Sequence, residues 1–486
     1  MTYEQLLSCI PHTGGSADTV YRIEYDSRKA REGDLFVCLT GKRDGHDFAL
    51  HAYENGCRLF LCERPVTLPE DAVQAITEDT RAALPHISAH FYGHPADRLR
   101  LIGVTGTKGK TTTALLIAAI LNAAGQNCAY IGSNGVIING RRTETVNTTP
   151  ESRDLHHYFH LMEDAGVRCA VLEVSSQALA HHRVDGIRFE TVVFTNLSED
   201  HVGPGEHSDF EDYRQSKRRL FTSHGAAHAV YNADDPAWEY MLADFAGEKI
   251  SYGIDAAADY MGADLARYRT STALGVSFVC RHGSRDVPVR LMSPGMFSVS
   301  NGLAAIAVCE SFGIDREFSA GVLERTPVQG RFEIIEGLPE RTFVIDYAHN
   351  GFSLTHALQT LREYEPQRLI CVFGSVGGRT KGRRRELAEA ASALADYSIL
   401  TSDNPDFEAP EAVVNEIASY MSQESEYECI VDRGAAVRRA VGMAQVGDIV
   451  LFAGKGHETY QLVCGHKEPF VEREEILEAC RITAGV

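Results

Sequence analysis

Gly103-Val-Thr-Gly-Thr-Lys-Gly-Lys-Thr-Thr112 is the part of this sequence that says most about the fold. An apolar strand is expected just before it, over residues 100–104, and an apolar helix after it, over 111–122. Glycines let successive backbone N–H groups turn inward and form a nest for phosphate oxygens at the positive end of a helix. Strict G-x-x-x-x-G-K-T spacing would place a glycine at position 104, where Val104 stands, so a glycine-rich turn without a ligand is the alternative. The pattern predicts a nucleotide-binding loop made of Gly106, Thr107, Lys108, Gly109, Lys110, Thr111 and Thr112.

Length and charge limit the classes of protein to which the chain can belong. The 486 residues correspond to about three domains at roughly 150 residues each. A content of 44% hydrophobic and 23% charged residues is that of a globular protein. The net charge of −20 argues against a nucleic-acid partner, because phosphate backbones are bound by an excess of Lys and Arg. Any phosphate group must therefore be bound locally, by backbone N–H groups and a few cations.

The start of the chain and its cysteines indicate a cytoplasmic protein. Residues 1–9 have neither a basic start nor a long apolar stretch, so they are unlike a signal peptide. No apolar run approaches the ~18 residues of a membrane-spanning helix, so we expect no membrane insertion. The 12 cysteines are scattered and include no C-x-x-C pair, which favours buried, reduced thiols over a zinc site or a catalytic thiol.

Patterns of apolar residues and turns divide the chain into three α/β blocks. We expect a small N-terminal α/β domain over residues 1–97, a central P-loop-type domain with a mostly parallel sheet over 98–327, and a C-terminal Rossmann-like domain over 328–486. Short apolar runs alternate with helical patterns, as in parallel sheets. Strands are expected at 34–39, 58–62, 100–104, 169–173, 191–195, 228–231, 342–346, 369–373, 397–401 and 448–452, and helices at 84–92, 111–122, 382–394 and 410–421.

Polar residues that follow two central strands are candidates for a metal site. Glu173 ends the strand at 169–173, and His201 follows the next strand along the chain. Ligands of open parallel sheets bind beyond the carboxyl ends of the strands. Mg²⁺ prefers oxygen ligands, and the Thr111 hydroxyl of the loop can supply one while Lys110 reaches the phosphates. Each polar residue alone reads as a solvated loop residue, but beside the nucleotide loop they favour a magnesium site.

Seven motifs occur in the order in which Mur ligases have them, so the sequence resembles that family and, within it, the MurE type. The resemblance spans nearly the whole chain, because Asp26-Ser-Arg28 in the first block also fits the MurE type. The seven motifs are Gly106-Thr-Lys-Gly-Lys-Thr111, Asn147-Thr-Thr-Pro150, Glu173-Val-Ser-Ser176, Asn196 with Asp200-His201, Asp346-Tyr-Ala-His349, Asp403-Asn-Pro405 and Gly454-Lys-Gly-His-Glu458.

The resemblance implies an ADP-forming amide ligase of peptidoglycan precursor synthesis that acts on UDP-N-acetylmuramoyl-L-Ala-D-Glu. ATP would phosphorylate the side-chain carboxylate of D-Glu, and the amine of a diamino acid would attack the acyl phosphate and displace phosphate. A carboxylate is a poor electrophile and repels the γ-phosphate, so Mg²⁺ is expected as the cofactor. The UDP-dipeptide, ATP and a diamino acid are therefore the expected partners, and a monomer is the expected state.

The resemblance also implies catalytic, metal-site and ATP-site residues. Lys110, Glu173, His201 and Lys217 match catalytic positions, and Thr111 joins the last three at the metal site. Lys217 matches the lysine that carries a carbamate in the family, although the basic run 217–219 alone reads as a surface segment. Besides the loop, ATP would contact Asn301, Arg331, Asp346 and Asn350, with capping or turn roles as the alternatives for Asn301 and Asn350.

Two more groups of residues are implied to bind the other substrates. Arg183 would clamp a carboxylate of the UDP-dipeptide, because its guanidinium is a planar fork suited to bidentate recognition. His181 stands where a glutamine is expected. The UDP-dipeptide group is Ser27, Thr148, Thr149, Ser175, His181 and Arg183, and the amino-acid group is Arg379, Asp403, Asn404, Asp406, Gly454 and Glu458.

The sequence departs from the family pattern where the incoming amino acid is recognised. Diaminopimelate-adding members carry Asp-Asn-Pro-Arg, and this chain has Asp406 in place of the arginine. An aspartate there repels a second carboxylate, so lysine or ornithine is favoured over meso-diaminopimelate. Against this, Arg379 and the motif at 454–458 are as in the diaminopimelate enzymes, and Lys381, Arg383 or Arg384 could supply another clamp.

Two other functions are alternatives. One is another ligase of the same superfamily, such as a folylpolyglutamate synthase or a MurE-like enzyme in a side pathway; Asp26-Ser-Arg28 and Asn147-Thr-Thr-Pro150 argue against a folate substrate. The other is a nucleotide-binding homologue without catalysis. The retention of Lys110, Glu173, His201 and Lys217 argues against it.

Overall fold

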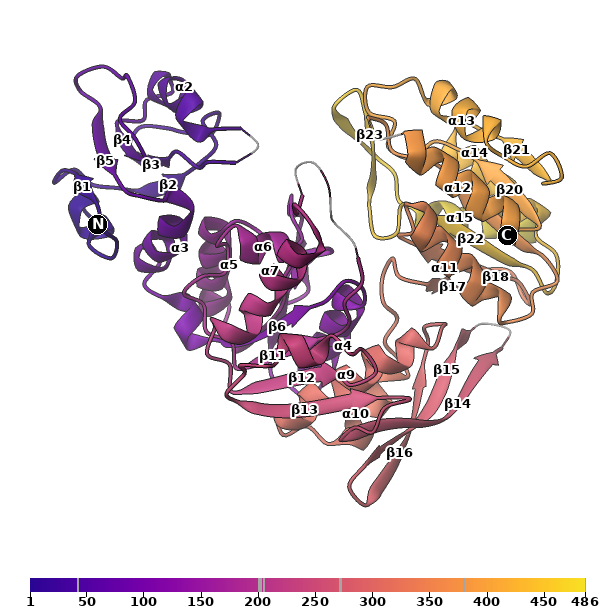
Figure 1. The fold of residues 1–486 in the computed structure, drawn as a ribbon. Coiled ribbons are helices and arrows are strands. Elements are labelled where there is room, and N and C mark those ends of the chain that lie inside the picture. Colours follow the sequence, from indigo (N-terminus) through magenta and orange to yellow (C-terminus); the bar gives the residue numbers. More distant parts are fainter. Residues whose placement is uncertain (42, 200–202, 204–205, 271–272, 379–380, 486) are drawn as a thin grey trace. The chain divides into compact units, whose positions relative to one another are not determined.

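The computed structural model describes residues 1–41, 43–199, 203, 206–270, 273–378 and 381–485. The helices and strands of these residues are drawn in Figure 1. The chain divides into two compact units, residues 1–260 with 304–314 and residues 261–303 with 315–486. Both units combine helices with mostly parallel sheets, so the predicted α/β class is confirmed. The predicted domain boundaries near 97 and 327 stay predictions.

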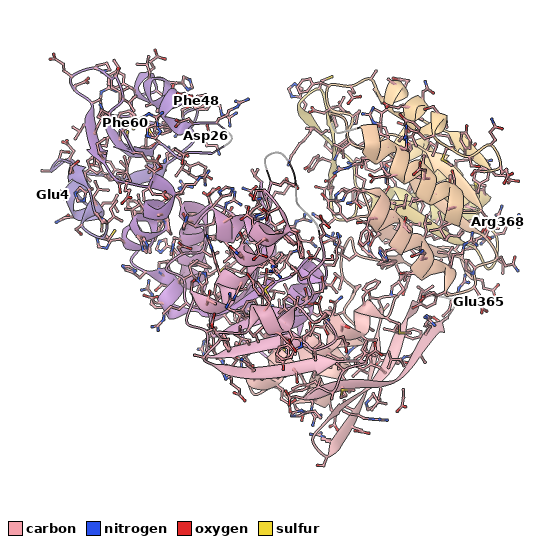
Figure 2. All side chains as sticks on the ribbon, in the orientation of Figure 1. Glu4, Asp26, Phe48, Phe60, Glu365 and Arg368 are labelled. Carbon is pink, nitrogen blue, oxygen red and sulfur yellow. The ribbon has the colours of Figure 1, made fainter. Side chains whose placement is uncertain are left out.

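The N-terminal part of the first unit is built on a five-stranded sheet in the order β1-β5-β4-β3-β2. Its strands are parallel except for β1, which pairs antiparallel with β5. Phe60 of β4, which is labelled in Figure 2, packs edge-on against Phe36 of β3 on one face of this sheet. The elements are α1 (Tyr3–Leu7), β1 (Thr13–Gly14), β2 (Arg22–Glu24), β3 (Asp34–Val37), η1 (Gly45–Phe48), α2 (Ala49–Glu54), β4 (Leu59–Cys62), β5 (Val73–Ile76), α3 (Thr80–Phe91) and η2 (Pro95–Arg98).

A second sheet in the first unit runs β13-β12-β11-β6-β10-β7-β8-β9. It is parallel from β13 to β7, and β8 and β9 add antiparallel edge strands. The elements are β6 (Arg100–Thr105), α4 (Lys110–Ala123), β7 (Cys128–Gly132), β8 (Gly135–Ile138), β9 (Arg141–Thr143), α5 (Ser152–Asp164), β10 (Cys169–Glu173), α6 (Ser176–Ala180), β11 (Thr191–Phe194), α7 (Phe210–Thr222), β12 (His228–Asn232), α8 (Trp238–Met241) and β13 (Glu248–Gly253).

Strand β6 lies between β10 and β11, and this position gathers the polar residues that follow the three strands. All three strands are almost wholly buried, because helices cover both faces of a parallel sheet and leave no solvated side. Their parallel direction brings their carboxyl ends to one edge. The glycine-rich loop, Glu173 and Asn196 therefore share that edge.

The second unit contains an antiparallel three-stranded segment and a second α/β sheet. The α/β sheet has the order β17-β18-β22-β19-β20-β21, parallel except for β17. The elements are β14 (Tyr260–Arg269), β15 (Leu274–His282), β16 (Arg285–Leu291), α10 (Arg316–Leu323), β17 (Glu333–Ile335), β18 (Thr342–Asp346), α11 (Gly351–Arg362), β19 (Leu369–Phe373), α12 (Lys381–Leu394), β20 (Tyr397–Leu400), α13 (Pro410–Ser419), β21 (Tyr427–Cys429), α14 (Arg433–Met443), β22 (Ile449–Ala453), β23 (Tyr460–Val463), β24 (His466–Pro469) and α15 (Glu472–Ala484), and α9 (Phe297–Ser311) contributes residues to both units.

Spanning a lipid bilayer takes a helix of about 20 mostly apolar residues, and the helices that the structure describes fall short of this. None of them has both the length and the apolar character needed to cross one.

Helix α5 carries an unusual buried histidine where it packs against α3. The His156 ring is 2% exposed, and neither ring nitrogen has a hydrogen-bond partner. Burial, reinforced by His94 and His86, lowers the pKa of His156 to about 3. Because only the neutral ring fits this interior, protonation opposes folding.

We expect replacement of His156 by Leu to make the protein less sensitive to acid. The folded pKa lies below the ordinary value of about 6.5, so the native state is most stable above that pH and loses stability as the pH falls. Between pH 7.5 and pH 5.0 this histidine accounts for about 2 kcal/mol of lost stability. Urea unfolding at both pH values should show a loss smaller by that amount in the His156→Leu variant. His160→Leu, a change on a more exposed side of the same helix, is the control, and an equal effect in both variants would contradict the prediction.

Candidate functional site

The glycine-rich loop joins β6 to α4 in a conformation that only glycine adopts easily. Gly106 has φ +151° and Gly109, at the N-terminus of α4, has φ +82°. A Cβ atom at position 106 would lie 1.9 Å from the Thr195 hydroxyl oxygen. The Lys108 backbone N–H donates to the Asn196 side-chain oxygen (2.8 Å), which ties the loop to the segment after β11. Val104 is an ordinary buried residue of β6, so the departure from strict spacing leaves the loop intact.

Lys110 and Lys217 both point at the same loop carbonyl. The Lys110 ammonium donates to the carbonyl oxygens of Gly106 (2.8 Å) and Thr107 (3.0 Å). Lys217, in α7, is 1% exposed, and its ammonium donates to the Gly106 carbonyl at 2.9 Å. It also lies 4.5 Å from the centre of the Tyr213 ring. Lys217 is therefore beside the nucleotide loop and is not the surface lysine that its basic neighbours indicate.

Glu173 and Thr111, two of the predicted metal-site residues, are in contact. The Thr111 hydroxyl donates to Glu173 Oε2 at 2.9 Å, and Glu173 is fully buried. The other carboxylate oxygen, Oε1, accepts from the Tyr130 hydroxyl and from the Ser133 backbone N–H. A hydroxyl and a carboxylate oxygen next to a phosphate-binding loop form a donor set that suits Mg²⁺. His201 lies outside the described residues.

Ser133 and Tyr130 are contacts that the sequence did not reveal. They come from β7 and the turn after it, and no motif marks them. The Ser133 hydroxyl is 3.1 Å from the Thr148 hydroxyl and 3.4 Å from Glu173 Oε2. Ser133 thus connects the candidate metal site to the candidate UDP-dipeptide residues.

Thr149, Ser175 and Arg183 lie together at the carboxyl end of β10. The Thr149 hydroxyl donates to the Glu173 carbonyl (2.7 Å) and is 3.3 Å from the Ser175 hydroxyl, which caps α6. Arg183 donates to the Thr149 carbonyl (3.1 Å) and to the Glu151 carboxylate (2.9 Å). Arg183, which was predicted to bind a carboxylate of the UDP-dipeptide, is therefore already bonded to a carboxylate of its own chain.

Two other predicted UDP-dipeptide residues have different surroundings. His181 follows α6, and burial together with the Arg81 and Arg183 guanidinium groups lowers its pKa to about 4. Ser27 lies in the N-terminal part and is 7% exposed, and its hydroxyl is 3.0 Å from His51 Nδ1. The uncharged His181 ring can accept as well as donate a hydrogen bond, as the glutamine expected there would.

A cavity of about 650 Å³ lies beside the loop in the first unit. It adjoins the loop through residues 196–198, because the Leu197 backbone N–H donates to Asp235 while its neighbour Asn196 bonds to Lys108. The sequence signal that marks it is Asn232-Ala-Asp-Asp235, directly after the predicted strand at 228–231. The lining residues are Leu197, Phe210, Arg214, Asn232, Asp234, Asp235, Pro236, Ala237 and Tyr240.

The predicted ATP residues of the second unit cluster at the end of β18. Asp346 ends this strand, and its Oδ2 accepts from the Phe332 backbone N–H at 2.9 Å. Burial raises the pKa of the Asp346 carboxyl, and the Arg331 guanidinium opposes that shift. The Arg331 guanidinium lies 5.1 Å from the centre of the Tyr347 ring. Asn350 caps α11 through the Ser353 backbone N–H, which is the capping role weighed as the alternative.

Asn301, the remaining predicted ATP residue, lies in α9. Its side chain is 6% exposed.

The predicted amino-acid residues meet where β20 and β22 end. Asn404 Nδ2 donates to Glu458 Oε2 at 2.9 Å, so the two motifs are directly bonded. Gly454 has φ +110°, and a Cβ there would lie 2.9 Å from Asp403 Oδ2. Asp406 Oδ1 accepts from the Gly465 backbone N–H at 2.9 Å, in the turn between β23 and β24. Arg379 lies outside the described residues.

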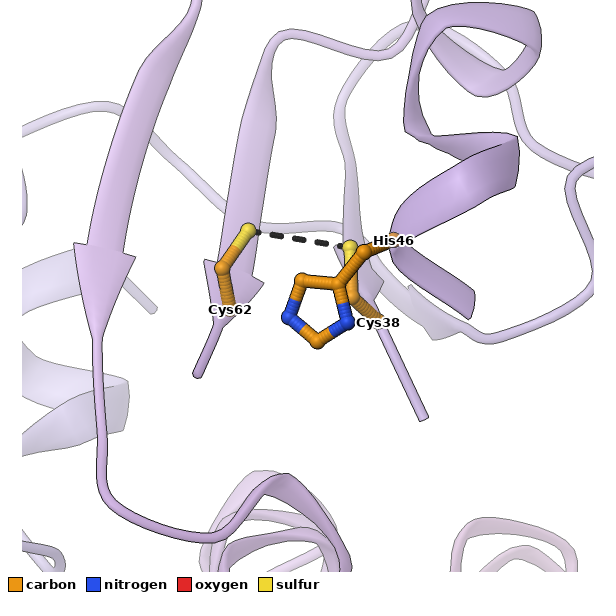
Figure 3. Close-up of side chains that lie close together, drawn as sticks. All are labelled: Cys38, His46 and Cys62. Carbon is orange, nitrogen blue, oxygen red and sulfur yellow. Dashed lines mark hydrogen bonds between the residues drawn. The ribbon is translucent and has the colours of Figure 1, made fainter. Parts of the chain in front are cut away.

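One group of thiols and an imidazole in the N-terminal part has the composition of a metal site (Figure 3). Cys38, His46 and Cys62 place their ligand atoms within 4.8 Å of one another, and the two sulfurs are 3.6 Å apart. However, His46 Nδ1 is 2.6 Å from an Asp44 carboxylate oxygen, and Nε2 accepts the Glu63 backbone N–H at 2.9 Å. Both ring nitrogens are occupied, so the imidazole links a loop to the end of β4. The group fits the expectation of buried, reduced thiols.

Known protein families match most of the length of this chain. Family models match residues 19–92 (Mur ligase family, catalytic domain), 104–309 (Mur ligase middle domain) and 330–456 (Mur ligase, glutamate ligase domain). A relative from Geobacillus thermodenitrificans is 39% identical over 477 residues, which cover 95% of this chain and 96% of the relative. A relative from Syntrophomonas wolfei is 39% identical over 466 residues, covering 94% of each. Both are named UDP-N-acetylmuramoyl-L-alanyl-D-glutamate–2,6-diaminopimelate ligase.

Solved structures give the same result for the whole chain. A structure of a ligase with that same name matches with a TM-score of 0.70 and 30% identity, covering 100% of this chain and 99% of the other. The MurF ligase from Thermotoga maritima in complex with ADP is 19% identical with a TM-score of 0.60, covering 96% of this chain and 98% of the other, and shows the fold alone. The predicted three-domain α/β fold is thereby confirmed. The chain belongs to the Mur ligase family and is, like the other members, an ATP-dependent ligase.

Proposed function

We propose that the chain joins a diamino acid to the D-Glu side chain of UDP-N-acetylmuramoyl-L-Ala-D-Glu in peptidoglycan precursor synthesis. An oxygen of the D-Glu carboxylate attacks the γ-phosphorus of ATP, and ADP leaves. The amine of the diamino acid then attacks the carbonyl carbon of the acyl phosphate, and phosphate leaves as the amide forms and the amine loses a proton. The observation that carries the proposal is the Thr111–Glu173 contact beside the glycine-rich loop, in a member of a ligase family.

Residues of the first unit would hold the reacting phosphate and carboxylate. Lys110 releases its two loop carbonyls and binds the phosphates of ATP. Thr111 and Glu173, with His201 and a carbamylated Lys217, are the proposed Mg²⁺ ligands. Mg²⁺ supplies charge neutralisation between the γ-phosphate and the attacking carboxylate.

The remaining first-unit residues are assigned by their place around that centre. Thr148, Thr149, Ser175, His181 and Arg183 lie on the side of Glu173 that Ser133 connects to the metal site, and we assign them to the muramoyl dipeptide. Ser27 is assigned to the UDP end. Arg183 would exchange the Glu151 carboxylate for one of the substrate.

The adenine and ribose of ATP are assigned to the cavity beside the loop. Phe210 and Tyr240 give it aromatic walls against which a base can stack, while the Asn232 amide is held by the Thr195 carbonyl and the Asp234 backbone N–H. Asn301, Arg331, Asp346 and Asn350 are kept as proposed ATP contacts from the rest of the chain.

The chemistry around the incoming amino acid favours lysine or ornithine. Arg384, one of the candidate clamps, is 4% exposed and is bonded to Glu408 and Glu416. Asp406 adds a carboxylate in the place of the family's arginine. Meso-diaminopimelate is the second candidate, because the relatives at 39% identity are named for it. Cytoplasmic location and a monomeric state stay part of the proposal.

A phosphate-release assay on the UDP-muramoyl dipeptide tests the proposed function and its acceptor. Lysine, ornithine and meso-diaminopimelate are offered separately with ATP and Mg²⁺. We expect turnover with lysine or ornithine to exceed turnover with diaminopimelate by at least about tenfold, since a like-charge contact costs several kcal/mol. A preference for diaminopimelate would overturn the assignment of Asp406. No turnover with any acceptor would overturn the function and favour a side-pathway ligase or a non-catalytic homologue.

A further inference from the structure

A buried lysine connects the two motifs that meet at the ends of β20 and β22. Lys455 is fully buried, and its ammonium donates to Asn404 Oδ1 and to the Tyr460 carbonyl (2.5 and 2.8 Å). It is also 3.2 Å from Glu458 Oε2 and 3.2 Å from Asp403 Oδ1. An ammonium group has three donors, so these contacts use its whole capacity.

The contacts of Lys455 determine how Asn404 is oriented. Asn404 Oδ1 accepts both from Lys455 and from the Leu462 backbone N–H (2.9 Å). The amide nitrogen must then point the other way, and it donates to Glu458 Oε2. Lys455 and the Leu462 N–H together thus turn the Asn404 amide nitrogen toward Glu458.

The charges of the cluster leave one carboxylate uncompensated. Lys455 lies between two carboxylates, Asp403 and Glu458, and the neighbouring buried Arg433, on which both also act, is bonded to a third, Glu472 (2.7 Å), so two cations face three carboxylates. The Asp403 side chain is 2% exposed and that of Glu458 is 15% exposed. The excess negative charge can therefore be reached by solvent only at Glu458, whose Oε1 is held at 3.4 Å by the Tyr347 hydroxyl.

We propose that Lys455 is a positioning residue for the incoming amino acid. Its ammonium locks Asn404 and Glu458 together and cancels one of two carboxylates, so that a single negative charge meets the ammonium group of the acceptor. The proposal rests on the proposed function, because it assigns Asn404 and Glu458 to the amino acid. Lys455 itself, being fully buried, acts on the acceptor only through these two residues.

Steady-state kinetics of a Lys455→Met variant test this role. Methionine has a similar length but neither charge nor donors, so Asn404 Oδ1 keeps the Leu462 N–H but loses the ammonium, and Glu458 and Asp403 lose the positive charge that lies between them. We expect the KM for the amino acid to rise at least about tenfold, while kcat and the KM for ATP stay within about threefold. If Lys455→Met does not fold by circular dichroism, Lys455→Gln, which keeps two N–H donors, takes its place with a smaller increase in KM.

Arg433→Met is the matched control. It removes a buried cation of the same region. The Arg433 guanidinium donates to Glu472 and to the carbonyls of Ser402 and Ala453, and not to Asn404 or Glu458 in the described part of the chain. We expect a loss of thermal stability similar to that of Lys455→Met, with the acceptor KM within about threefold of the wild-type value. An unchanged acceptor KM in folded Lys455 variants, or an equal rise in Arg433→Met, would overturn the proposal. Wild-type turnover tests the proposed function separately, because it does not depend on either variant.

Discussion

Replacement of Lys110 by Ala should abolish ATP-dependent phosphate release and leave the fold unchanged. In the structure the Lys110 ammonium donates to the carbonyls of Gly106 and Thr107 in its own loop, and the residue is partly exposed, so we expect the fold to tolerate its removal. In the proposed reaction it is the cation that reaches the phosphates as negative charge is redistributed. Loss of one such cation costs about 10³-fold in turnover in phosphoryl transfer. In Lys110→Ala the rate of phosphate release should therefore fall, while the thermal unfolding temperature stays near the wild-type value.

Lys108→Ala provides the comparison within the same loop. Lys108 is exposed, and its backbone N–H, which the substitution retains, makes the bond to Asn196. We expect a much smaller loss than for Lys110→Ala, because an exposed cation contributes only a screened charge. Turnover by Lys110→Ala close to that of the wild type would show that the loop does not bind the reacting phosphates.

The ten strands predicted from the sequence all pair in parallel with a neighbour, but the prediction missed the antiparallel strands and also the parallel strands β2, β5, β7, β13 and β21. Strands such as β10 and β19 are buried on both faces, so they appear as continuous apolar runs with clear ends, and the predicted bounds 169–173 and 369–373 are confirmed. The hairpins β14–β16 and β23–β24 were not predicted. β16 alternates buried and exposed residues and contains Pro288, and every residue of β23 is partly exposed, so neither has a long apolar run.

The site shows the same division between local patterns and contacts set by tertiary structure. The contact between Thr111 and Glu173 could be predicted, because β6, which leads into the loop before Thr111, and β10, which Glu173 ends, are neighbours in the sheet. Ser133 and Lys455 could not, since their roles depend on which side chains they face across the fold. The burial of Lys217 could have been predicted from helical spacing, although its basic neighbours indicate a surface lysine. Tyr213, Lys217, Leu220 and Phe221 share the buried face of α7 at helical spacing.

The net charge of −20 is compatible with phosphate-bearing substrates because few cations are needed and they are placed locally. Lys110 and Lys217 converge on the Gly106 carbonyl from different helices, so their ammonium groups are less than about 6 Å apart. Two like charges at that distance disfavour each other. Conversion of one lysine into a carbamate would replace the repulsion with attraction and would add oxygen ligands for Mg²⁺.

Lys217→Ala should be inactive and should recover activity when short carboxylic acids are added. The substitution leaves a cavity beside the loop where the side chain was, because Lys217 is 1% exposed. If the active form is a carbamate, the missing group is a carboxylate, and formate or acetate can occupy the space and supply it. We expect a loss of about 10²–10⁴-fold in phosphate release, of the size seen when a group that stabilises transition-state charge is removed. Added acid should restore activity at least tenfold, as measured by the same assay over a range of formate and acetate concentrations.

Lys110→Ala under identical conditions separates this rescue from a general salt effect. A carboxylate cannot replace the phosphate-binding ammonium of Lys110, so the acids should give no recovery there. Neutral amides of the same size, formamide and acetamide, should fail with Lys217→Ala because they carry no charge for the metal ion. Full activity of Lys217→Ala without any additive would make the buried lysine a packing residue. Recovery with ammonium salts but not with carboxylates would show that the working form is the unmodified amine that donates to Gly106.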